Sequence, residues 1–185
     1  MSENSDSELM RQVRDGRTSV FATLFERHHA RLYRYCLRMT GNRPTSEDLV
    51  QDVFMKMLKH KAQFRDDSAF MPWMYGIARN ACAMHWRRAA LHPVAESDLG
   101  DATLPEPYAD DDHAGAEQAD LVRRALLKLP AQRREVLVLS RYEFKTYEEI
   151  AEALDCTVSA VKVRAHRALK QLKDIYRDLA GEVPT

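Results

Sequence analysis

The chain has 185 residues, of which 45% are hydrophobic, and its 28 Lys and Arg residues equal its 28 Asp and Glu residues, so the formal net charge is zero. The three cysteines lie far apart without a CxxC pair, and neither a signal peptide nor a long apolar run precedes them. These features argue against a secreted, disulfide-bonded protein and against membrane insertion. We therefore expect a cytoplasmic protein with reduced thiols.

Charge is distributed unevenly along the chain. Residues 1–95 hold fifteen basic against ten acidic residues, residues 96–120 hold none against nine, and residues 121–185 hold thirteen against nine. The acidic segment is poor in large apolar residues, so it buries too little surface to fold alone. This pattern predicts two small domains, residues 8–92 and 121–180, joined by a flexible acidic linker, residues 93–120. The linker is either a charged tether, which the sequence alone favours, or a nucleic-acid mimic or spacer through an acid-tolerant channel.

The spacing of apolar residues in the first domain is helical throughout, which predicts a helical bundle. A first long helix carries apolar residues at steps of three and four from Phe21 to Met39, and Gly41 ends it. His28 lies in this apolar stripe, so we expect it to be a buried core histidine.

A second helix is predicted to begin at Pro44, where Thr45 and Asp48 form a capping box. Its core face consists of apolar residues at helical spacing: Leu49, Val50, Val53, Phe54, Met57 and Leu58. Its outer face is a mixed polar stripe of Asp48, Gln51, Asp52 and Lys56, and a simple solvated face has the same pattern.

A third helix is predicted from Ser68 to Arg88, with Pro72 tolerated near its first turn. The predicted inner face is Phe70, Trp73, Met74, Ile77, Ala81 and Met84, so spacing alone makes Trp73 a core residue rather than a stacking platform. The outer face gathers hydrogen-bond donors: Arg79, Asn80, Arg87 and Arg88. Just before this helix, Phe64 and Phe70 flank a polar loop. Aromatic side chains and donors beside a loop are what a protein needs to hold an unstacked base and its backbone.

The seven histidines and three cysteines raise the question of a metal site. Cys82 and His85 have the helical i, i+3 spacing of two ligands, but no two further ligands stand at a suitable spacing. We therefore predict no metal site, and plain buried thiols at Cys36 and Cys82.

Residues 146–167 carry the pattern of a helix-turn-helix. Thr146 and Glu149 form a capping box for a first helix, Asp155-Cys156 interrupts the apolar period, and Thr157 is a suitable N-cap for a second helix. The inner faces of the two helices are Ile150, Ala151 and Leu154, and Val158, Val161, Ala165, Leu169 and Leu172.

The outer face of the second helix is basic. It consists of Ser159, Lys162, Val163, Arg164 and Arg167, and no acidic residue occurs between Val158 and Lys173. A helix of this kind suits the major groove and its flanking phosphates. The alternative is an ordinary helical hairpin with a solvated basic face, but the small Ala151 at the helix crossing and the capped turn favour a helix-turn-helix.

Three segments in this order resemble the bacterial extracytoplasmic-function (group IV) sigma factors of RNA polymerase. Residues 46–60, SEDLVQDVFMKMLKH, are similar to the helix with which that family docks on the clamp of core RNA polymerase. Residues 64–88 resemble the segment that recognises and opens the promoter's minus-ten element. Residues 126–154 with the helix-turn-helix resemble the sigma-four domain, which reads the minus-thirty-five element. The resemblance implies an all-α fold with a sigma-two helical bundle and a sigma-four helix-turn-helix domain.

The resemblance also implies roles for individual residues. Contact with core polymerase would come from Asp48, Leu49, Gln51, Asp52, Phe54 and Met55. The minus-ten element would be bound by Phe64, Ser68, Ala69, Phe70, Trp73, Arg79, Asn80, Arg87 and Arg88, several of them around a flipped non-template base. The minus-thirty-five element would be bound by Thr157, Ser159, Ala160, Lys162, Arg164 and Arg167.

This sequence departs from the family pattern at three positions of the helix-turn-helix. Asp155 stands where most members have Gly, but Asp tolerates a positive φ better than most residues. Val163 stands in place of the usual Ser and removes a possible phosphate donor, and Ala165 in place of Leu thins the core under the helix. The family pattern therefore does not define the exact promoter preference of this chain.

The resemblance implies a non-enzymatic subunit that binds core RNA polymerase and promoter DNA, needs no cofactor or metal, and is held inactive by an anti-sigma factor. One alternative is a stand-alone helix-turn-helix regulator, which would have no need of the segments 46–60 and 64–88. A second is a helical hydrolase with a metal held by Glu47, Asp48, Asp52 and the histidines, but the histidines do not fall at ligand spacing on the same helices.

Overall fold

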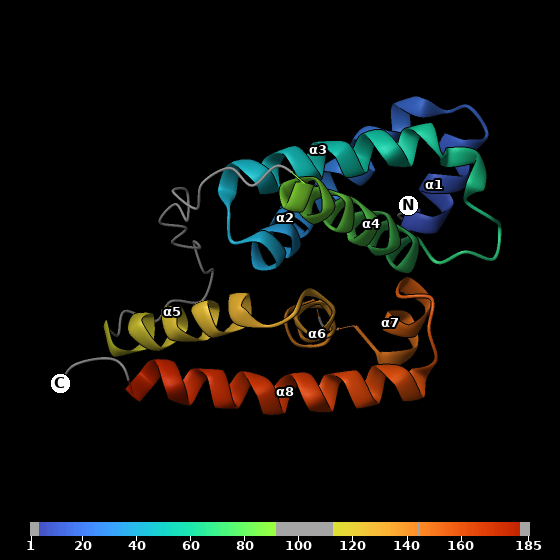
Figure 1. Ribbon diagram of the computed structural model, residues 1–185. Coiled ribbons are helices and arrows are strands. Elements are labelled where there is room, and N and C mark those ends of the chain that lie inside the picture. Colours follow the sequence, from blue (N-terminus) through green and yellow to red (C-terminus); the bar gives the residue numbers. More distant parts are fainter. Residues whose placement is uncertain (1–3, 92–112, 144, 182–185) are drawn as a thin grey trace.

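A computed structural model describes residues 4–91, 113–143 and 145–181 of the chain. Every regular element in these ranges is a helix, which confirms the predicted all-α fold (Figure 1). The N-terminal group comprises α1 (Asp6–Arg14), α2 (Phe21–Thr40), α3 (Arg43–Lys59) and α4 (Phe70–Leu91). The C-terminal group comprises α5 (His113–Lys128), α6 (Ala131–Leu137), α7 (Tyr147–Ala153) and α8 (Val158–Gly181). Short helical turns lie at Thr18–Val20, Lys61–Gln63 and Val138–Tyr142.

The turn between α2 and α3 is tighter than the sequence predicted. Gly41 ends α2 with a φ of 72°, as expected of a glycine at this position. The next helix, however, already begins at Arg43, because the Asn42 side chain accepts a hydrogen bond from the Thr45 amide at 2.9 Å. The predicted capping box of Thr45 with Asp48 was therefore wrong, and Asn42 is the cap.

The first helix of the C-terminal group begins inside the predicted linker. Residues 113–120, which the sequence assigned to the linker, belong to α5. Ala, Glu and Gln, which favour helix, occur in this stretch, and the same helix then packs Leu121 and Ala125 against Leu179 of α8. The remaining linker residues, 93–112, lie outside the described residues.

The N-terminal group is a bundle in which α2 and α4 both pack against α3. As predicted, His28 is a core residue: it is only 5% exposed, and its Nε2 lies 2.8 Å from the Asp6 carboxylate at the start of α1. Burial lowers the pKa of His28, so the neutral ring is favoured. This contact fixes α1 against α2.

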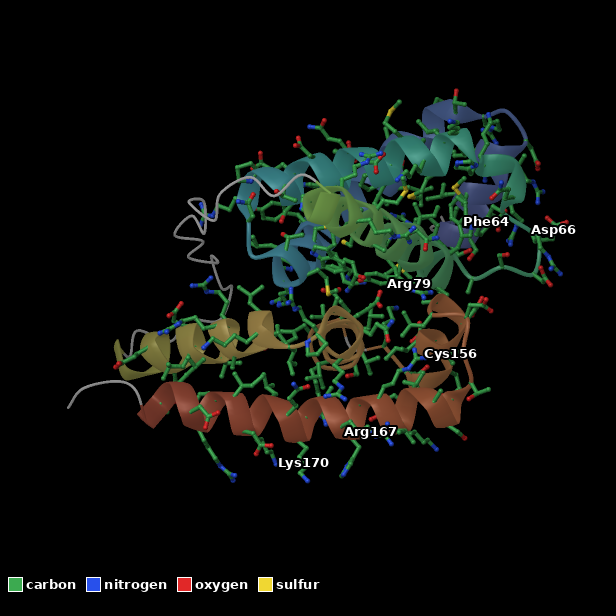
Figure 2. The ribbon with its side chains drawn as sticks, viewed as in Figure 1. Phe64, Asp66, Arg79, Cys156, Arg167 and Lys170 are labelled. Atoms are coloured by element: carbon green, nitrogen blue, oxygen red, sulfur yellow. The ribbon has the colours of Figure 1, made fainter. Side chains whose placement is uncertain are left out.

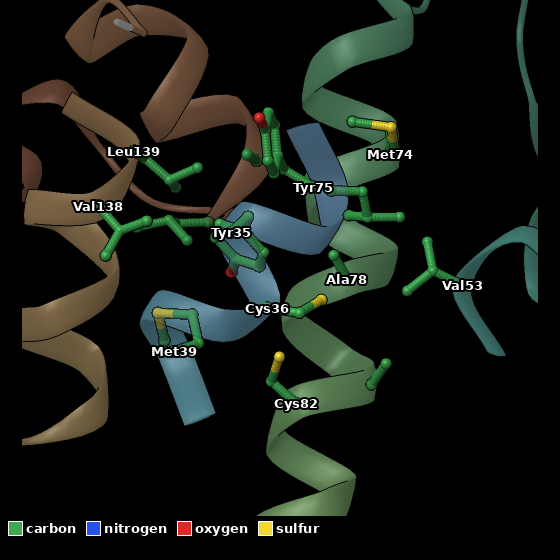
Figure 3. Close-up of a cluster of buried hydrophobic side chains, with 14 of the residues drawn as sticks. Tyr35, Cys36, Met39, Val53, Met74, Tyr75, Ala78, Cys82, Val138 and Leu139 are labelled. Atoms are coloured by element: carbon green, nitrogen blue, oxygen red, sulfur yellow. The ribbon is translucent and has the colours of Figure 1, made fainter. Parts of the chain in front are cut away.

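The two helix groups share one hydrophobic core. Figure 3 shows Tyr35 of α2 beside Tyr75 of α4 on one side and Val138 and Leu139 of the C-terminal group on the other. The ring centroids of the two tyrosines are 5.2 Å apart, and both tyrosines are almost fully buried. The N-terminal and C-terminal groups therefore form one closed body in this structure.

Two buried carboxylates cross this shared core. The Tyr35 hydroxyl donates to Glu135 at 3.0 Å, and the Tyr75 hydroxyl donates to Glu143 at 2.7 Å. Burial raises the pKa of both tyrosines, so they remain protonated donors. We call these two contacts the interdomain pairs.

Arg134 of α6 bridges the ends of two helices. Its guanidinium donates to the carbonyl groups of Met39, near the end of α2, and of Leu127 and Leu129, at the end of α5. A cation at the C-terminal end of a helix satisfies carbonyls that lack a partner within the helix. Arg134 therefore ties the N-terminal group to the C-terminal group by a second, polar route.

Candidate nucleic-acid interface

The helix-turn-helix forms as the sequence predicted. The Thr146 hydroxyl accepts from the Glu149 amide at 3.2 Å while the Glu149 carboxylate accepts from the Thr146 amide at 2.9 Å, which completes the capping box. Asp155 has a φ of 48°, so the turn does use the left-handed conformation that glycine supplies more readily. The Thr157 hydroxyl then accepts from the Ala160 amide at 3.2 Å and caps α8. These caps fix the direction in which α8 leaves the turn.

The first half of α8 exposes a polar, mainly basic stripe. We call it the reading face, and its exposed residues are Ser159, Lys162, Val163, His166, Arg167 and Lys170. These positions are three or four residues apart and so lie on one side of the helix. Figure 2 shows Arg167 and Lys170 pointing away from both helix groups. The reading face is therefore open in the closed body, with Thr157 exposed at its N-terminal end and Ala160 half-buried beside it.

Arg164 does not belong to the reading face, although the sequence placed it there. Its side chain is half-buried, with one guanidinium nitrogen 3.9 Å from the Cys156 sulfur. Position 164 borders the inner face formed by Val161 and Ala165, which explains why the side chain turns inward. His166 was not among the predicted residues of this face, although it is exposed there. Its position three residues after Val163 places it on the same side of the helix.

The aromatic residues that flank the loop before α4 lie in the core. Phe64 is 0% exposed and packs edge-on against Trp73 at 5.1 Å, and Phe70 is 2% exposed and packs against His28 at 4.9 Å. Neither ring is accessible in this conformation, and contact of Phe64 and Phe70 with a base stays a prediction. Of the same predicted set, Ala69 is exposed, and Ser68 and Trp73 are half-buried.

The outer face of α4 is partly as predicted. Asn80, Arg87 and Arg88 are exposed, and Met84, which the sequence assigned to the core, is 41% exposed between them. Arg79 faces the C-terminal group instead: it donates to the Leu154 carbonyl at 3.1 Å (Figure 2). Its guanidinium also lies 3.9 Å from the Glu135 carboxylate. In the closed body, Arg79, one of the predicted minus-ten residues, is therefore bound to the C-terminal group.

The outer face of α3 carries a second exposed stripe. Asp48, Gln51, Asp52 and Met55 are exposed on one side of the helix, and Met55, at 66%, is the most exposed of the large apolar residues in the described ranges. Lys56 pairs with Asp52 at 2.6 Å. We call these four exposed residues the α3 stripe.

Two residues predicted to contact a partner through this helix are buried. Leu49 is 6% exposed and Phe54 is 4% exposed, so both belong to the core beneath the α3 stripe. The ring of Phe54 packs against Phe25 at 4.8 Å, and Phe25 itself is 42% exposed. Leu49 and Phe54 therefore hold the stripe in place from below.

The metal hypotheses require a cluster of His, Cys, Asp or Glu side chains. In the described part of the chain, no three side chains of His, Cys, Asp or Glu gather in a way that would hold an ion. Cys36 and Cys82 are both buried, as predicted, and a hydrogen bond from one thiol to the other together with burial raises the pKa of Cys36. None of the described helices has the length and apolar character needed to cross a membrane.

Comparison with known proteins identifies both helix groups. Residues 24–91 match the family model described as sigma-70 region 2, and residues 119–172 match that described as sigma-70, region 4. The sigma factor CarQ of Myxococcus xanthus is 32% identical over 174 residues, which cover 94% of this chain and 99% of CarQ. The ECF sigma factor SigM of Mycobacterium tuberculosis is 33% identical over 171 residues, or 92% of this chain and 84% of SigM. The chain belongs to the extracytoplasmic-function (ECF) sigma factors of RNA polymerase. This sigma factor directs RNA polymerase to promoters, and sigma factors as a family are not enzymes.

Solved structures agree with the fold of this sigma factor. A sigma factor, RpoE of Bartonella quintana, solved with the anti-sigma factor NepR, is 25% identical, has a TM-score of 0.68 and covers 85% of this chain and 96% of its own. CnrH, solved with the cytosolic domain of CnrY, has a TM-score of 0.72 at 23% identity and covers 97% of this chain and 100% of its own. Because α2–α4 match region 2, the hypothesis of a stand-alone regulator has no support.

Proposed function

We propose that this sigma factor divides promoter recognition between the reading face of α8 and the outer face of α4. The observation that carries the proposal is the reading face itself, a basic stripe on a capped helix-turn-helix that stays open in the closed body. In a helix-turn-helix, the second helix enters the major groove and its N-terminal residues meet base edges. Ser159, Lys162 and Arg167 would then contact the minus-thirty-five element, with Thr157 and Ala160 at the entry to the groove.

The minus-ten element is assigned to α4 and the loop before it. Asn80, Arg87 and Arg88 supply exposed donors along the helix, and Ala69 with the half-buried Ser68 borders them at its start. The half-buried Trp73 is the aromatic residue of this set that retains exposed surface, with Phe64 packed behind it. Capture of a base outside the stack offsets an unstacking cost of a few kcal/mol, so strand opening needs no ATP.

Core polymerase is assigned to the α3 stripe. Its two carboxylates, one amide and one exposed thioether suit a partner surface that is basic at its rim and apolar at its centre. The resemblance to the family's clamp-binding helix, residues 46–60, supports the same assignment. Leu49 and Phe54 contribute by rigidity rather than by contact, because they are buried.

The closed body has to open before both promoter elements are read together. Elements centred near positions −10 and −35 are about 25 base pairs apart, or about 85 Å at the 3.4 Å rise of B-DNA. A compact chain of this length has a radius of gyration of only about 16 Å. Opening would also release Arg79 from the Leu154 carbonyl. The interdomain pairs are thus part of a resting arrangement.

An anti-sigma factor is the further partner that we propose. RpoE of Bartonella quintana was solved with the anti-sigma factor NepR, and the likeness of its fold covers 85% of this chain. Two exposed apolar side chains, Met55 in the α3 stripe and Phe25, which packs against Phe54 of α3, provide apolar surface for a competitor of core polymerase.

The assignment of the reading face predicts how binding depends on salt. Replacing Lys162 and Arg167 together with alanine should weaken binding to a minus-thirty-five duplex. The slope of log K against log salt should fall by about two, because each phosphate that a cation neutralises contributes roughly 0.9 to it. Arg177→Ala is the matched control, because Arg177 is an exposed arginine about three turns further along the same helix and pairs with Asp174.

The measurement is a titration of labelled duplex with the sigma factor at several salt concentrations. The control variant should keep the wild-type slope. If the double variant also keeps it, the two cations do not contact phosphates and the assignment of this face is wrong.

A further inference from the structure

Val163 lies in the middle of the reading face, yet it is apolar. Its side chain is 48% exposed, and its exposed neighbours on the same side of α8 are Lys162, His166 and Arg167. Valine forms no hydrogen bond with a base edge or a phosphate, so it cannot share the role of these neighbours. Its place in the second turn of α8, next to Ser159 and Lys162, is where a helix-turn-helix meets base edges.

The surroundings of Val163 indicate what it contacts. A protein partner that buried Val163 would also have to bury Lys162 and Arg167, and the centres of protein interfaces are depleted of charge. Duplex DNA satisfies both features at once, since phosphates line the groove on both sides and the C5 methyl group of thymine is the apolar feature of the major groove. The cations therefore flank the groove while the valine faces its floor.

We propose that Val163 reads a thymine in the minus-thirty-five element through van der Waals contact with its C5 methyl group. This inference rests on the proposed function and adds to it a specificity-determining residue. The half-buried Arg164, turned toward Cys156, leaves this part of the helix clear of a competing side chain. The selected base pair is then recognised by shape and apolar contact rather than by a hydrogen bond.

The test pairs a protein variant with the removal of one methyl group from the DNA. Deoxyuridine replaces each thymine of the minus-thirty-five element in turn, in a promoter that the wild-type holoenzyme transcribes, and removes only the C5 methyl group. Dissociation constants are measured for holoenzymes with wild-type sigma factor, Val163→Ala and Val163→Thr. Val163→Ala is not expected to unfold the chain, because the side chain is exposed and alanine favours helix.

At one or two positions, deoxyuridine should weaken the wild-type complex about three- to tenfold and the Val163→Ala complex less than about 1.5-fold. Val163→Thr keeps one methyl group and should lie between them. Lys162→Ala is the control: it should weaken all duplexes and retain the full effect of deoxyuridine.

Equal effects of deoxyuridine on wild type and Val163→Ala at every position would overturn the role of Val163, as would the lack of any effect on wild type. In both of these cases promoter binding and transcription persist, so the proposed function survives. If the wild-type holoenzyme prefers no promoter duplex over random DNA, the proposed function fails together with this inference.

Discussion

Reversing the charges of Asp48 and Asp52 together to arginine is expected to weaken the binding of this sigma factor to core RNA polymerase by roughly 30- to 900-fold, or about 2–4 kcal/mol. Both carboxylates are exposed on the α3 stripe, and Asp52 pairs only with Lys56 of its own helix among the ion pairs of the described residues. Arginine at both positions would oppose a basic partner surface with like charge. The fold should tolerate the change, because both side chains point to solvent.

The control for this variant is Asp178→Arg, an equally exposed carboxylate near the end of α8. Its affinity for core polymerase should stay within about twofold of the wild type. Affinities are measured by competition against labelled wild-type sigma factor, and thermal unfolding checks that each variant is folded. Wild-type affinity of the double reversal would show that the α3 stripe does not contact the polymerase.

The interdomain pairs give the second large effect. Tyr35→Phe with Tyr75→Phe removes the hydroxyl donors to Glu135 and Glu143 and leaves both carboxylates buried with one partner fewer. Removing each hydrogen bond costs about 1–1.5 kcal/mol in the closed body and nothing in the open one, where water replaces the donor. The ratio of closed to open molecules should therefore fall by roughly 30- to 150-fold.

Single-molecule energy transfer measures this ratio directly. Dyes are placed on cysteines introduced at the exposed positions Gln63 and Asp178, with Cys156 replaced by serine. Tyr176→Phe removes a hydroxyl from the separate cluster of α5 and α8 and should leave the distribution unchanged. A double variant that gives the wild-type distribution would mean that the pairs do not hold the groups together.

The pair of Tyr35 and Glu135 also predicts a pH dependence of closing. Burial raises the pKa of Glu135, although Tyr35, Arg79 and Arg164 face its carboxylate and act in the opposite direction. The closed body thus holds the Glu135 proton more tightly than the open one. The stabilisation of the closed body by this proton is fully present below the ordinary carboxyl pKa and is lost as pH rises through the raised value, so closing should strengthen as pH falls through the raised pKa of Glu135. In Glu135→Gln this dependence should be reduced.

Local patterns predicted the elements of this sigma factor well. The capping box of Thr146 and Glu149, the left-handed Asp155 and the helix end at Gly41 all depend on residues close in sequence. Helical periodicity also identified His28 as a core residue and the exposed side of α3. Such features are determined by residues within a few positions of one another, so they can be predicted from the sequence alone.

The errors arose where packing between distant segments decides exposure. Phe64 looks like an accessible aromatic residue beside a loop, but its contact with Trp73 buries it. Arg79 was predicted on the outer face of α4, but in the structure it donates to the carbonyl of Leu154 at the end of α7. No spacing rule within one helix predicts a partner that is 75 residues away, as in that bond.

The start of α3 was misjudged for a different reason. Asn42 and Thr45 are both good caps, and the two-residue turn set by Gly41 selects the first of them. The helix α5 also extends into the acidic segment, and it packs against Leu179 through Leu121 and Ala125, which follow that segment. Charge alone therefore does not locate the start of this helix.

Run-off transcription with purified core polymerase measures whether this sigma factor directs initiation at specific promoters through its reading face. Fragments from a library of the native genome serve as templates, with and without this sigma factor. We expect discrete transcripts that require the sigma factor, start downstream of a shared pair of upstream elements, and disappear with Lys162→Ala combined with Arg167→Ala. If a folded protein that binds core polymerase gives no sigma-dependent transcript across the library, it does not direct promoter-specific initiation.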